Sequence, residues 1–314
     1  DVLTRIINYS RRKIMEKQKK IKRCASDRVL ITIFYILVAI FAIVCLYPLL
    51  LAIGTSFADE ASVTVNGYRV IPKKFSLSAY QMILGSMGKN LLNAYTVTIG
   101  VTVFGTLLSV LVSAAFAYVL TVREFKPKGA LNMFLYIPMI FSAGLLPWYI
   151  MCTKYYHLTD SFLALVLPCC MNAFNVFLLR NFFKSIPEEL AEAAKIDGAN
   201  YLRIFRVIYF PLAKVGLVTV GLFYALSYWN DYYLSLMFIN KQNMYPLQYY
   251  LYNMLSNVQF MANQANASLG YNINIPLETT KMATICVTVG PIILLYPFAQ
   301  KYITKGVIVG AVKG

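Results

Sequence analysis

Six long stretches of the sequence are almost free of charged residues, and they constrain the fold more than any other feature. They cover residues 29–53, 91–122, 130–153, 161–179, 215–239 and 282–299. Each is long enough to cross a hydrocarbon core of about 30 Å as an α-helix that rises about 1.5 Å per residue. Only helices satisfy their own backbone groups in lipid, and the alternating pattern of a β-barrel is absent. We therefore expect an all-α polytopic membrane protein with six transmembrane helices.

Basic residues predict how these helices are oriented. Of the 29 Lys and Arg residues, 22 lie in segments 1–28, 123–129, 180–214 and 301–314. Only 6 lie in the intervening loops 54–90, 154–160 and 240–276. Because Lys and Arg in short loops are retained on the cytoplasmic side, we expect both termini to be cytoplasmic. The chain then divides into a basic N-terminal arm, residues 1–28, and a membrane domain, residues 29–314, inserted in the cell membrane.

The composition excludes several other classes of protein. A net charge of +16 is typical of nucleic-acid binding, but such proteins are rarely 59% hydrophobic and only 13% charged. We expect no nucleic-acid partner and assign the positive charge to the face that meets anionic lipid. The six cysteines have no C-x-x-C spacing and His157 is the only histidine, so we predict neither a metal site nor a disulfide framework.

The polar segment 185–211 predicts two short helices that project from the cytoplasmic side. Ser185 and Glu188 have the S-x-x-E spacing of a capping box, which places the start of the first helix near residue 186. Gly198 can adopt the positive φ that ends a helix, so the first helix ends near residue 196. The second begins at residue 200 and stops at Pro211, which cannot continue a helix. The first helix has an apolar surface flanked by glutamates, which a groove on a partner protein could accept.

This segment resembles the EAA loop of binding-protein-dependent ABC importer permeases. The matching residues are Glu192, Ala193, Ala194, Gly198, Ile208 and Pro211. Phe210 stands where the family pattern has leucine, which is a substitution of one bulky apolar residue by another. The surrounding residues 179–200 are similar to maltose-type carbohydrate permeases, especially the branch associated with oligosaccharides and aldouronates in Gram-positive bacteria.

The resemblance implies a transport subunit with no catalytic residues. In this family the EAA element is a coupling helix that docks on a separate ATPase and transmits its movement to the membrane helices. The residues that the resemblance assigns to coupling are Glu188, Glu189, Glu192, Ala193, Ala194, Asp197, Gly198 and Pro211. The chain lacks the G-x-x-x-x-G-K-[ST] motif, so no cofactor is expected on it, and ATP and Mg belong to the ATPase.

The implied partners are a second homologous permease subunit, two ATPase subunits, a lipid-anchored extracellular binding protein and the oligosaccharide itself. In the family the external loop 240–276 reaches towards the binding protein, whereas the plain alternative is a lid on its own bundle. Two rivals from other classes are a polytopic membrane enzyme and a secondary transporter. The chain has only 13 acidic residues, and Asp231 and Glu278 are the only candidates for buried carboxylates, which disfavours both. A permease of this class for a non-sugar solute is a further alternative.

Sugars are gripped by aromatic rings and by neutral polar side chains, because a polyol offers no charge. The residues of these types expected to face a translocation path are Trp148, Tyr149, Asn172, Asn175, Tyr228, Trp229, Asn230 and Asp231. Asp231 is the one charge within the six apolar runs, and an ionisable residue at membrane depth is a functional candidate. The alternative is a place at the outer interface, where Tyr232 and Tyr233 would suit an aromatic belt.

Overall fold

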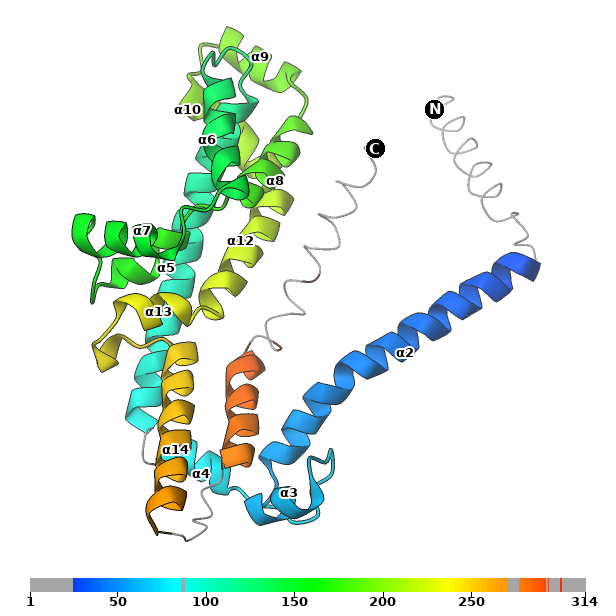
Figure 1. Ribbon diagram of the computed structural model, residues 1–314. Helices are drawn as coiled ribbons and strands as arrows, with labels where there is room; N and C mark the ends of the chain where they lie inside the picture. The colour runs from blue at the N-terminus through cyan, green and yellow to red at the C-terminus, as the bar shows by residue number, and fades with distance from the viewer. Residues whose placement is uncertain (1–24, 86–87, 270–276, 292, 294–299, 301–314) are drawn as a thin grey trace.

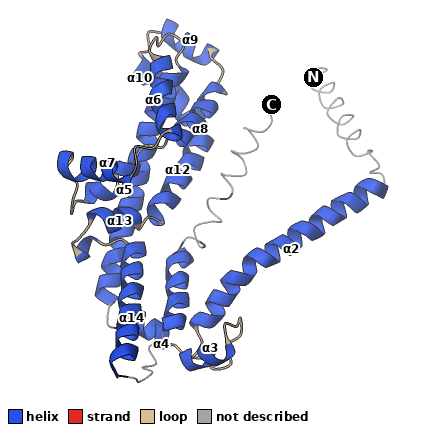
Figure 2. Cartoon of the chain, viewed as in Figure 1, coloured by secondary structure: helices blue, strands red, loops and turns tan. Residues whose placement is uncertain are grey.

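The computed structural model describes residues 25–85, 88–269, 277–291, 293 and 300. Within these residues the regular structure is helical (Figure 2), and a single isolated β-bridge joins Ala58 to Phe75. The all-α prediction is therefore confirmed. The basic arm falls almost wholly outside the described residues.

Among the residues that the structure describes, two helices are long and apolar enough to cross a membrane alone, namely α2 (Ala25–Ser56) and α5 (Gly88–Thr121). Three further crossings are possible only if a bent pair of helices counts as one span. The last predicted span is described as a helix only over 277–291. The count of six spans and the cytoplasmic termini thus stay predictions.

The bent pairs differ from the straight helices that the apolar runs predict. The first pair joins α6 (Lys128–Ile140) to α7 (Leu145–Ile150) and the π-helical turn η1 (Met151–Tyr155), with a bend of 118°. Gly144 takes a φ of +84° at this break. A positive φ interrupts a right-handed helix, so Gly144 marks a bend that the hydropathy of this run does not reveal.

The second pair joins two 3₁₀ turns, η2 (Phe162–Leu165) and η3 (Leu167–Cys169), to α8 (Ala173–Lys184) with a bend of 58°. The side chain of Asn172 accepts a hydrogen bond from the Asn175 N–H and so starts α8 afresh. A capping asparagine inside an apolar run therefore ends one helical piece and begins the next.

The third pair bends by 81° between residues 201–212 and α12 (Lys214–Trp229). Residues 201–212 comprise α10 (Tyr201–Ile204), the π-helical turn η4 (Phe205–Tyr209) and α11 (Phe210–Leu212). The predicted stop at Pro211 is wrong, because Pro211 lies inside α11 and the bend follows at Ala213. The π-helical turn η4 lies directly before Pro211. A π-helical turn has i→i+5 hydrogen bonds in place of the α-helical i→i+4 bonds, so the N–H that proline lacks is not needed in the usual place.

The core of the bundle is formed by α5, α8 and α12 (Figure 1). Ser109 and Ser113 of α5 hydrogen-bond to the hydroxyls of Tyr228 and Tyr224 of α12, at 2.9 and 2.7 Å. Gly105 lies against the Tyr228 ring, where a Cβ would come within 2.8 Å of it. Small residues thus bring α5 and α12 together, as is common in membrane helix packing.

A second cluster lies at the end of the bundle away from α9 (Glu189–Ile196) (Figure 1). It joins α4 (Ser78–Gly85), α5 and α14 (Leu247–Leu269). Sequence analysis treated 240–276 as a loop, yet most of it is this helix. Its buried residues are Leu247, Tyr250, Leu251 and Met254, which share one face of a helix. The short α13 (Tyr233–Phe238) and the 3₁₀ turn η5 (Gln242–Met244) connect α12 to α14.

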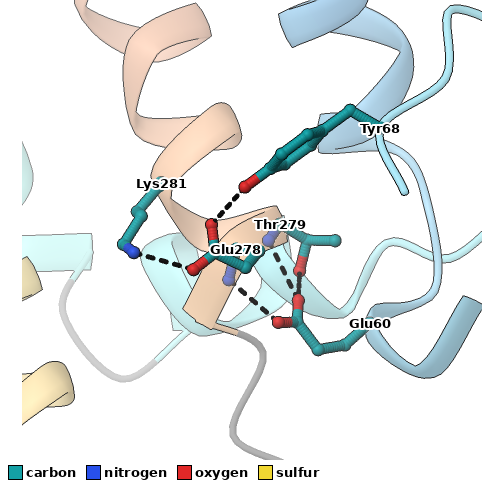
Figure 3. A network of polar contacts seen from close by, with 5 residues as sticks. All are labelled: Glu60, Tyr68, Glu278, Thr279 and Lys281. Carbon is teal, nitrogen blue, oxygen red and sulfur yellow. Dashed lines mark hydrogen bonds and ion pairs between the residues drawn. The ribbon is translucent and has the colours of Figure 1, made fainter. Parts of the chain in front are cut away.

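Most of α2 stands apart from this bundle and joins it only through its C-terminal end (Figure 1). The following helix, α3 (Glu60–Asn66), carries Glu60, which binds the start of helix 277–291 (Figure 3). Its carboxylate accepts hydrogen bonds from the Glu278 and Thr279 N–H groups at 2.9 Å and from the Thr279 hydroxyl at 2.7 Å. Glu278 in turn accepts from Tyr68 at 2.7 Å and from Lys281 at 2.8 Å. We call these five residues the clamp.

Candidate functional site

The predicted coupling helix is α9, and it begins differently from the prediction. Glu188 occupies the N-cap position and its side chain makes no capping hydrogen bond. Ser185 instead caps the C-terminal end of α8, where its hydroxyl donates to the Phe182 carbonyl at 2.7 Å. The capping box is therefore wrong, because α8 continues up to Ser185 and leaves only a tight turn before α9.

The C-terminal end of α9 follows the prediction. Gly198 has a φ of +80°, and its N–H donates to the Lys195 carbonyl at 3.0 Å. The Ala199 N–H donates to the Ala194 carbonyl at 2.9 Å, which completes the turn. The Asn200 side chain then accepts from the Arg203 N–H at 2.8 Å and starts α10. Gly198 thus reverses the chain between the two helices, in a conformation that other residues rarely adopt.

Two ion pairs hold α9 against the loop that follows α5. Arg123 lies 2.7 Å from Glu188, and Glu124 pairs with Lys195. The hydrogen bond from Lys195 lowers the pKa of Glu124, and the same bond raises the pKa of Lys195. Because residues 188 and 195 are two helical turns apart, both pairs lie on one face of α9. Arg123 and Glu124 were not among the predicted site residues, although the signal was available in a charged pair directly after an apolar run.

The opposite face of α9 is open to solvent. The side chains of Leu190, Ala193 and Ile196 are exposed, Ile196 at 87% of its surface. Glu189 and Glu192 are exposed beside them, as are Asp197 and Gly198, whereas Ala194 is half-buried. An apolar stripe with acidic flanks on a braced helix is suited to binding in a groove of another protein.

The membrane domain contains a cavity of about 560 Å³ at the break between η3 and α8. Its lining residues are Pro168, Cys169, Met171, Asn172, Phe174, Asn175, Phe223, Tyr224 and Ser227. We call it the membrane cavity. Non-helical backbone at membrane depth is tolerated where it lies inside protein or lines a water-filled space, which fits this position.

The membrane cavity brings together Asn172 and Asn175 from the predicted path. Tyr224 and Ser227 line the same space and were missed. Their spacing to Tyr228 places all three on one face of α12, which was the signal that could have identified them. Tyr224 also fixes the break itself, because its hydroxyl oxygen accepts the Asn172 N–H at 2.9 Å.

Trp148 and Tyr149 lie elsewhere, on α7. The Trp148 ring stacks on Tyr233 with centroids 6.5 Å apart, and it meets Phe238 edge-on at 5.2 Å. Tyr149 stacks on the same Phe238 ring at 5.7 Å. These aromatic side chains join α7 to α13, and neither Trp148 nor Tyr149 lines the membrane cavity.

The four consecutive residues 228–231 point in different directions. Tyr228 is buried and donates to the Val166 carbonyl at 3.0 Å, while Trp229 is buried and donates to the Thr288 carbonyl at 3.4 Å. Asn230 is exposed. Asp231 accepts the Leu234 N–H at 3.3 Å and so begins α13. Tyr228 and Trp229 pack inside the bundle. That any of these four residues faces the translocation path stays a prediction. Within the described residues no cluster could hold a metal ion.

A helical membrane chain that presents a braced amphipathic helix at one end and encloses a polar cavity at its helix breaks has the architecture of a transport subunit. The chain belongs to the family described as binding-protein-dependent transport system inner membrane component, whose model matches residues 128–309. Membership makes it a membrane permease of an ABC importer. It also implies a permease partner, an ATPase and a binding protein, and it favours the importer over the membrane enzyme and the secondary transporter.

Individual relatives cover nearly the whole chain. The polygalacturonan/rhamnogalacturonan transport system permease protein YtcP of Bacillus subtilis is 37% identical over 92% of this chain and 99% of its own length. The arabinooligosaccharides transport system permease protein AraQ of Halalkalibacterium halodurans is 27% identical over 88% of this chain and 94% of its own length. A chain in the crystal structure of a bacterial ABC transporter involved in the import of the acidic polysaccharide alginate is 32% identical, with a TM-score of 0.76. The match covers 89% of this chain and 98% of that chain.

Proposed function

We propose that this chain is one membrane half of an importer that takes up oligosaccharides delivered by an extracellular binding protein. The names of the relatives support a saccharide substrate, and the membrane cavity carries the proposal in this chain. Its polar groups are the amides of Asn172 and Asn175 and the hydroxyls of Tyr224 and Ser227, and Phe174 and Phe223 add aromatic rings. Amides, hydroxyls and rings bind the hydroxyl groups and C–H faces of saccharides, and none of these lining residues carries a full charge.

Filling the membrane cavity tests this proposal. Ser227→Trp places a large ring in the space, and we expect it to abolish uptake of labelled pectic or arabinose oligosaccharides by cells while the protein stays in the membrane. The matched control is Leu226→Trp, one residue away and not part of the lining, which should leave uptake close to normal. Unchanged uptake by a well-expressed Ser227→Trp variant would contradict the proposal.

The exposed face of α9 and the turn after it, with Glu189, Glu192, Ala193, Asp197 and Gly198, are proposed to dock on the ATPase. Glu188, Ala194 and Pro211 are proposed to support coupling from outside this face, because Glu188 pairs with Arg123, Ala194 is half-buried and Pro211 lies in α11. Two ATPase subunits, carrying ATP and Mg, would serve the two membrane halves. Glu192→Lys and Gly198→Asp should each abolish ATP-driven uptake and leave the chain in the membrane. Lys126→Gln, an exposed change in the neighbouring loop, is the control. Normal transport by a double Glu192→Lys, Gly198→Asp variant would rule out this role.

The second permease is proposed to be a different homologous chain that covers the break between α6 and α7. Residues 141–146 are exposed in this chain, although they lie within an apolar run and are not helical before residue 145. Irregular backbone does not face lipid, so a protein neighbour is required there. Affinity purification of this chain should recover a second permease and an ATPase, and recovery of the chain alone would count against the assembly.

The binding protein is proposed to be lipid-anchored and to meet the segment 240–276. The packed face of α14 holds this helix on its own bundle, and its polar face, rich in Asn and Gln, is left for the docking role. Replacing Asn253 and Asn257 by Asp should lower the ATPase stimulation that the binding protein produces. Full stimulation would favour the alternative, in which this segment only covers its own helix bundle.

A further inference from the structure

A second cavity, of about 640 Å³, lies between α5, α8 and the start of α9. Its lining residues are Leu120, Thr121, Arg123, Lys128, Arg180, Phe183, Lys184, Ser185, Ile186, Pro187, Glu188, Glu189 and Tyr209. We call it the basic pocket. It is separate from the membrane cavity, with which it shares no lining residue, and the coupling role of α9 does not account for it.

The charges that line the basic pocket do not balance. It has four cations, on Arg123, Lys128, Arg180 and Lys184, and two carboxylates, on Glu188 and Glu189. One cation is neutralised, because Arg123 pairs with Glu188. In the part of the chain that the structure describes, the other three cations form no ion pair within 4.0 Å.

Two of these cations bond only to neutral groups among the described residues. Arg180 donates from Nη1 to the Asn132 side-chain oxygen at 3.2 Å, and its buried Nε has no hydrogen-bond partner there. Lys128 points at the Arg123 and Val122 carbonyls at 3.4 and 3.5 Å. A buried donor without a partner is costly, and a charged acceptor is the group that would satisfy it best.

The position of the basic pocket along the helices indicates where such an anion comes from. Leu120 and Thr121 end the apolar run of α5, and Lys184 ends α8, so the pocket lies where the hydrocarbon core gives way to headgroups. Basic pockets at the cytoplasmic ends of membrane helices bind anionic lipid headgroups. The volume is within the range of small-ligand sites and accommodates a glycerophosphate.

We propose that the basic pocket binds a phosphate group, donated by an anionic lipid headgroup or by a soluble phosphate ester, with Arg180, Lys128 and Lys184 as its ligands. The bound phosphate would join the end of α8 to the loop 123–128 beside the coupling helix. This site does not depend on which solute the importer carries, because no residue of it lines the membrane cavity.

The test is direct lipid binding by the purified protein with whatever subunits accompany it. Phosphatidylglycerol or phosphatidylcholine is added in detergent, and bound lipid is counted by native mass spectrometry, without sugar or nucleotide. Lys128→Gln with Lys184→Gln should weaken phosphatidylglycerol binding roughly 30-fold. The control is Lys126→Gln with Arg203→Gln, which removes the same charge from exposed positions outside the lining. It should change binding by less than about twofold.

Two further experiments identify the source of the phosphate group and control for misfolding of the variants. Lys128→Arg with Lys184→Arg should restore binding, and the elution profile in size-exclusion chromatography reports folding. Competition by inorganic phosphate or glycerol phosphate, with no preference for the lipid, would support a soluble phosphate ligand at the same site. Equal binding by the pocket and control variants, or of the two lipids, would overturn the proposal. Binding that disappears only when the ATPase is present would also overturn it, since the pocket would then belong to that interface.

Discussion

The helices α2 and α5 are nearly equal in length and both are apolar, yet they have opposite surroundings. The most apolar stretch of α2 has a mean hydropathy of 3.1 and no buried residue, whereas that of α5 has 2.2 and is 39% buried. The more hydrophobic helix is thus the one that packs less. Apolarity inserts a helix in lipid, but lipid is as apolar as leucine and gives no reason for two helices to associate.

The residues that α5 possesses and α2 lacks explain the difference. Along its middle, α5 places Gly105, Ser109 and Ser113 on one face, where the rings and hydroxyls of α12 meet them. The corresponding part of α2 is built of bulky side chains such as Tyr35 and Phe41, which are 74% and 68% exposed. Its surface is suited to lipid or to another subunit. Its C-terminal end meets the bundle through the contact of Ser56 with the Tyr80 hydroxyl at 2.9 Å, and the clamp adds a second tie just beyond it.

The largest effect should come from adding volume to the α5 contact. Gly105→Leu forces a side chain against the Tyr228 ring, which Ser109 and Val166 hold in place. We expect it to lower the free energy of unfolding in detergent by roughly 1–3 kcal/mol. Ala42→Leu in α2, at an exposed position, should cost less than about 0.5 kcal/mol. Equal costs would show that α2 is packed as tightly as α5.

Removing the clamp is the next largest perturbation. Glu60→Ala deletes three hydrogen bonds to the start of helix 277–291 and should cost about 1–2 kcal/mol. Spin labels on α2 and on that helix should show a broadened distance distribution. Asp59→Ala is the control, because the Asp59 side chain makes no capping hydrogen bond. A distribution unchanged by Glu60→Ala would mean that something else anchors α2.

A smaller effect is expected from the hydroxyl pair in the α5 contact. A double-mutant cycle of Ser113→Ala and Tyr224→Phe should give a coupling energy of about 0.6 kcal/mol, the usual size for such bonds in membranes. Tyr35→Phe removes a hydroxyl from the exposed surface of α2 and should leave stability unchanged. A coupling energy near zero would mean that the packing of small residues, and not this hydrogen bond, stabilises the contact between α5 and α12.

The smallest effect is a pH dependence of the clamp, which the contact between α5 and α12 does not share. Hydrogen bonds from Lys281 and Tyr68 lower the pKa of Glu278 from its ordinary value of 4.5. Its contribution is therefore complete above pH 4.5 and is lost as the pH falls through the lower folded value. The α2 label distances should broaden on acidification, and Glu278→Gln should remove this dependence. The serine–tyrosine contacts of α5 have no carboxylate, so acidification to the same pH should leave them intact.

The sequence predicted the features that depend on local pattern. The apolar runs located the helical segments, and the EAA motif located α9 and the turn at Gly198. The same patterns failed where the contact is distant. Glu124 meets Lys195 across 71 positions, and no periodicity announces such a pair. Asn172 and Asn175 were found as sugar-binding residue types, but the membrane cavity that unites them with Tyr224 exists only after α8 and α12 have packed.

The broken helices show a second limit. Hydropathy averages over a window, so the short turn between α12 and α13 left the predicted span 215–239 unbroken. The polar face of α14 had the opposite effect and concealed a helix inside an expected loop. Both errors arise because these segments satisfy their polar groups against other protein segments rather than against lipid or water.

The clamp also bears on how the chain is made. Translation delivers α2 to the membrane long before the C-terminal helix exists, and Glu60 must find backbone groups 218 positions later in the chain. Until residue 281 has been synthesised, the end of α2 has its contacts with earlier residues, such as that of Ser56 with Tyr80, but it lacks the clamp. A chain interrupted before that point therefore carries a Glu60 carboxylate without its hydrogen-bond donors. The clamp can therefore form only after the last described helix has been made, and it then links the first and last parts of the membrane domain that the structure describes.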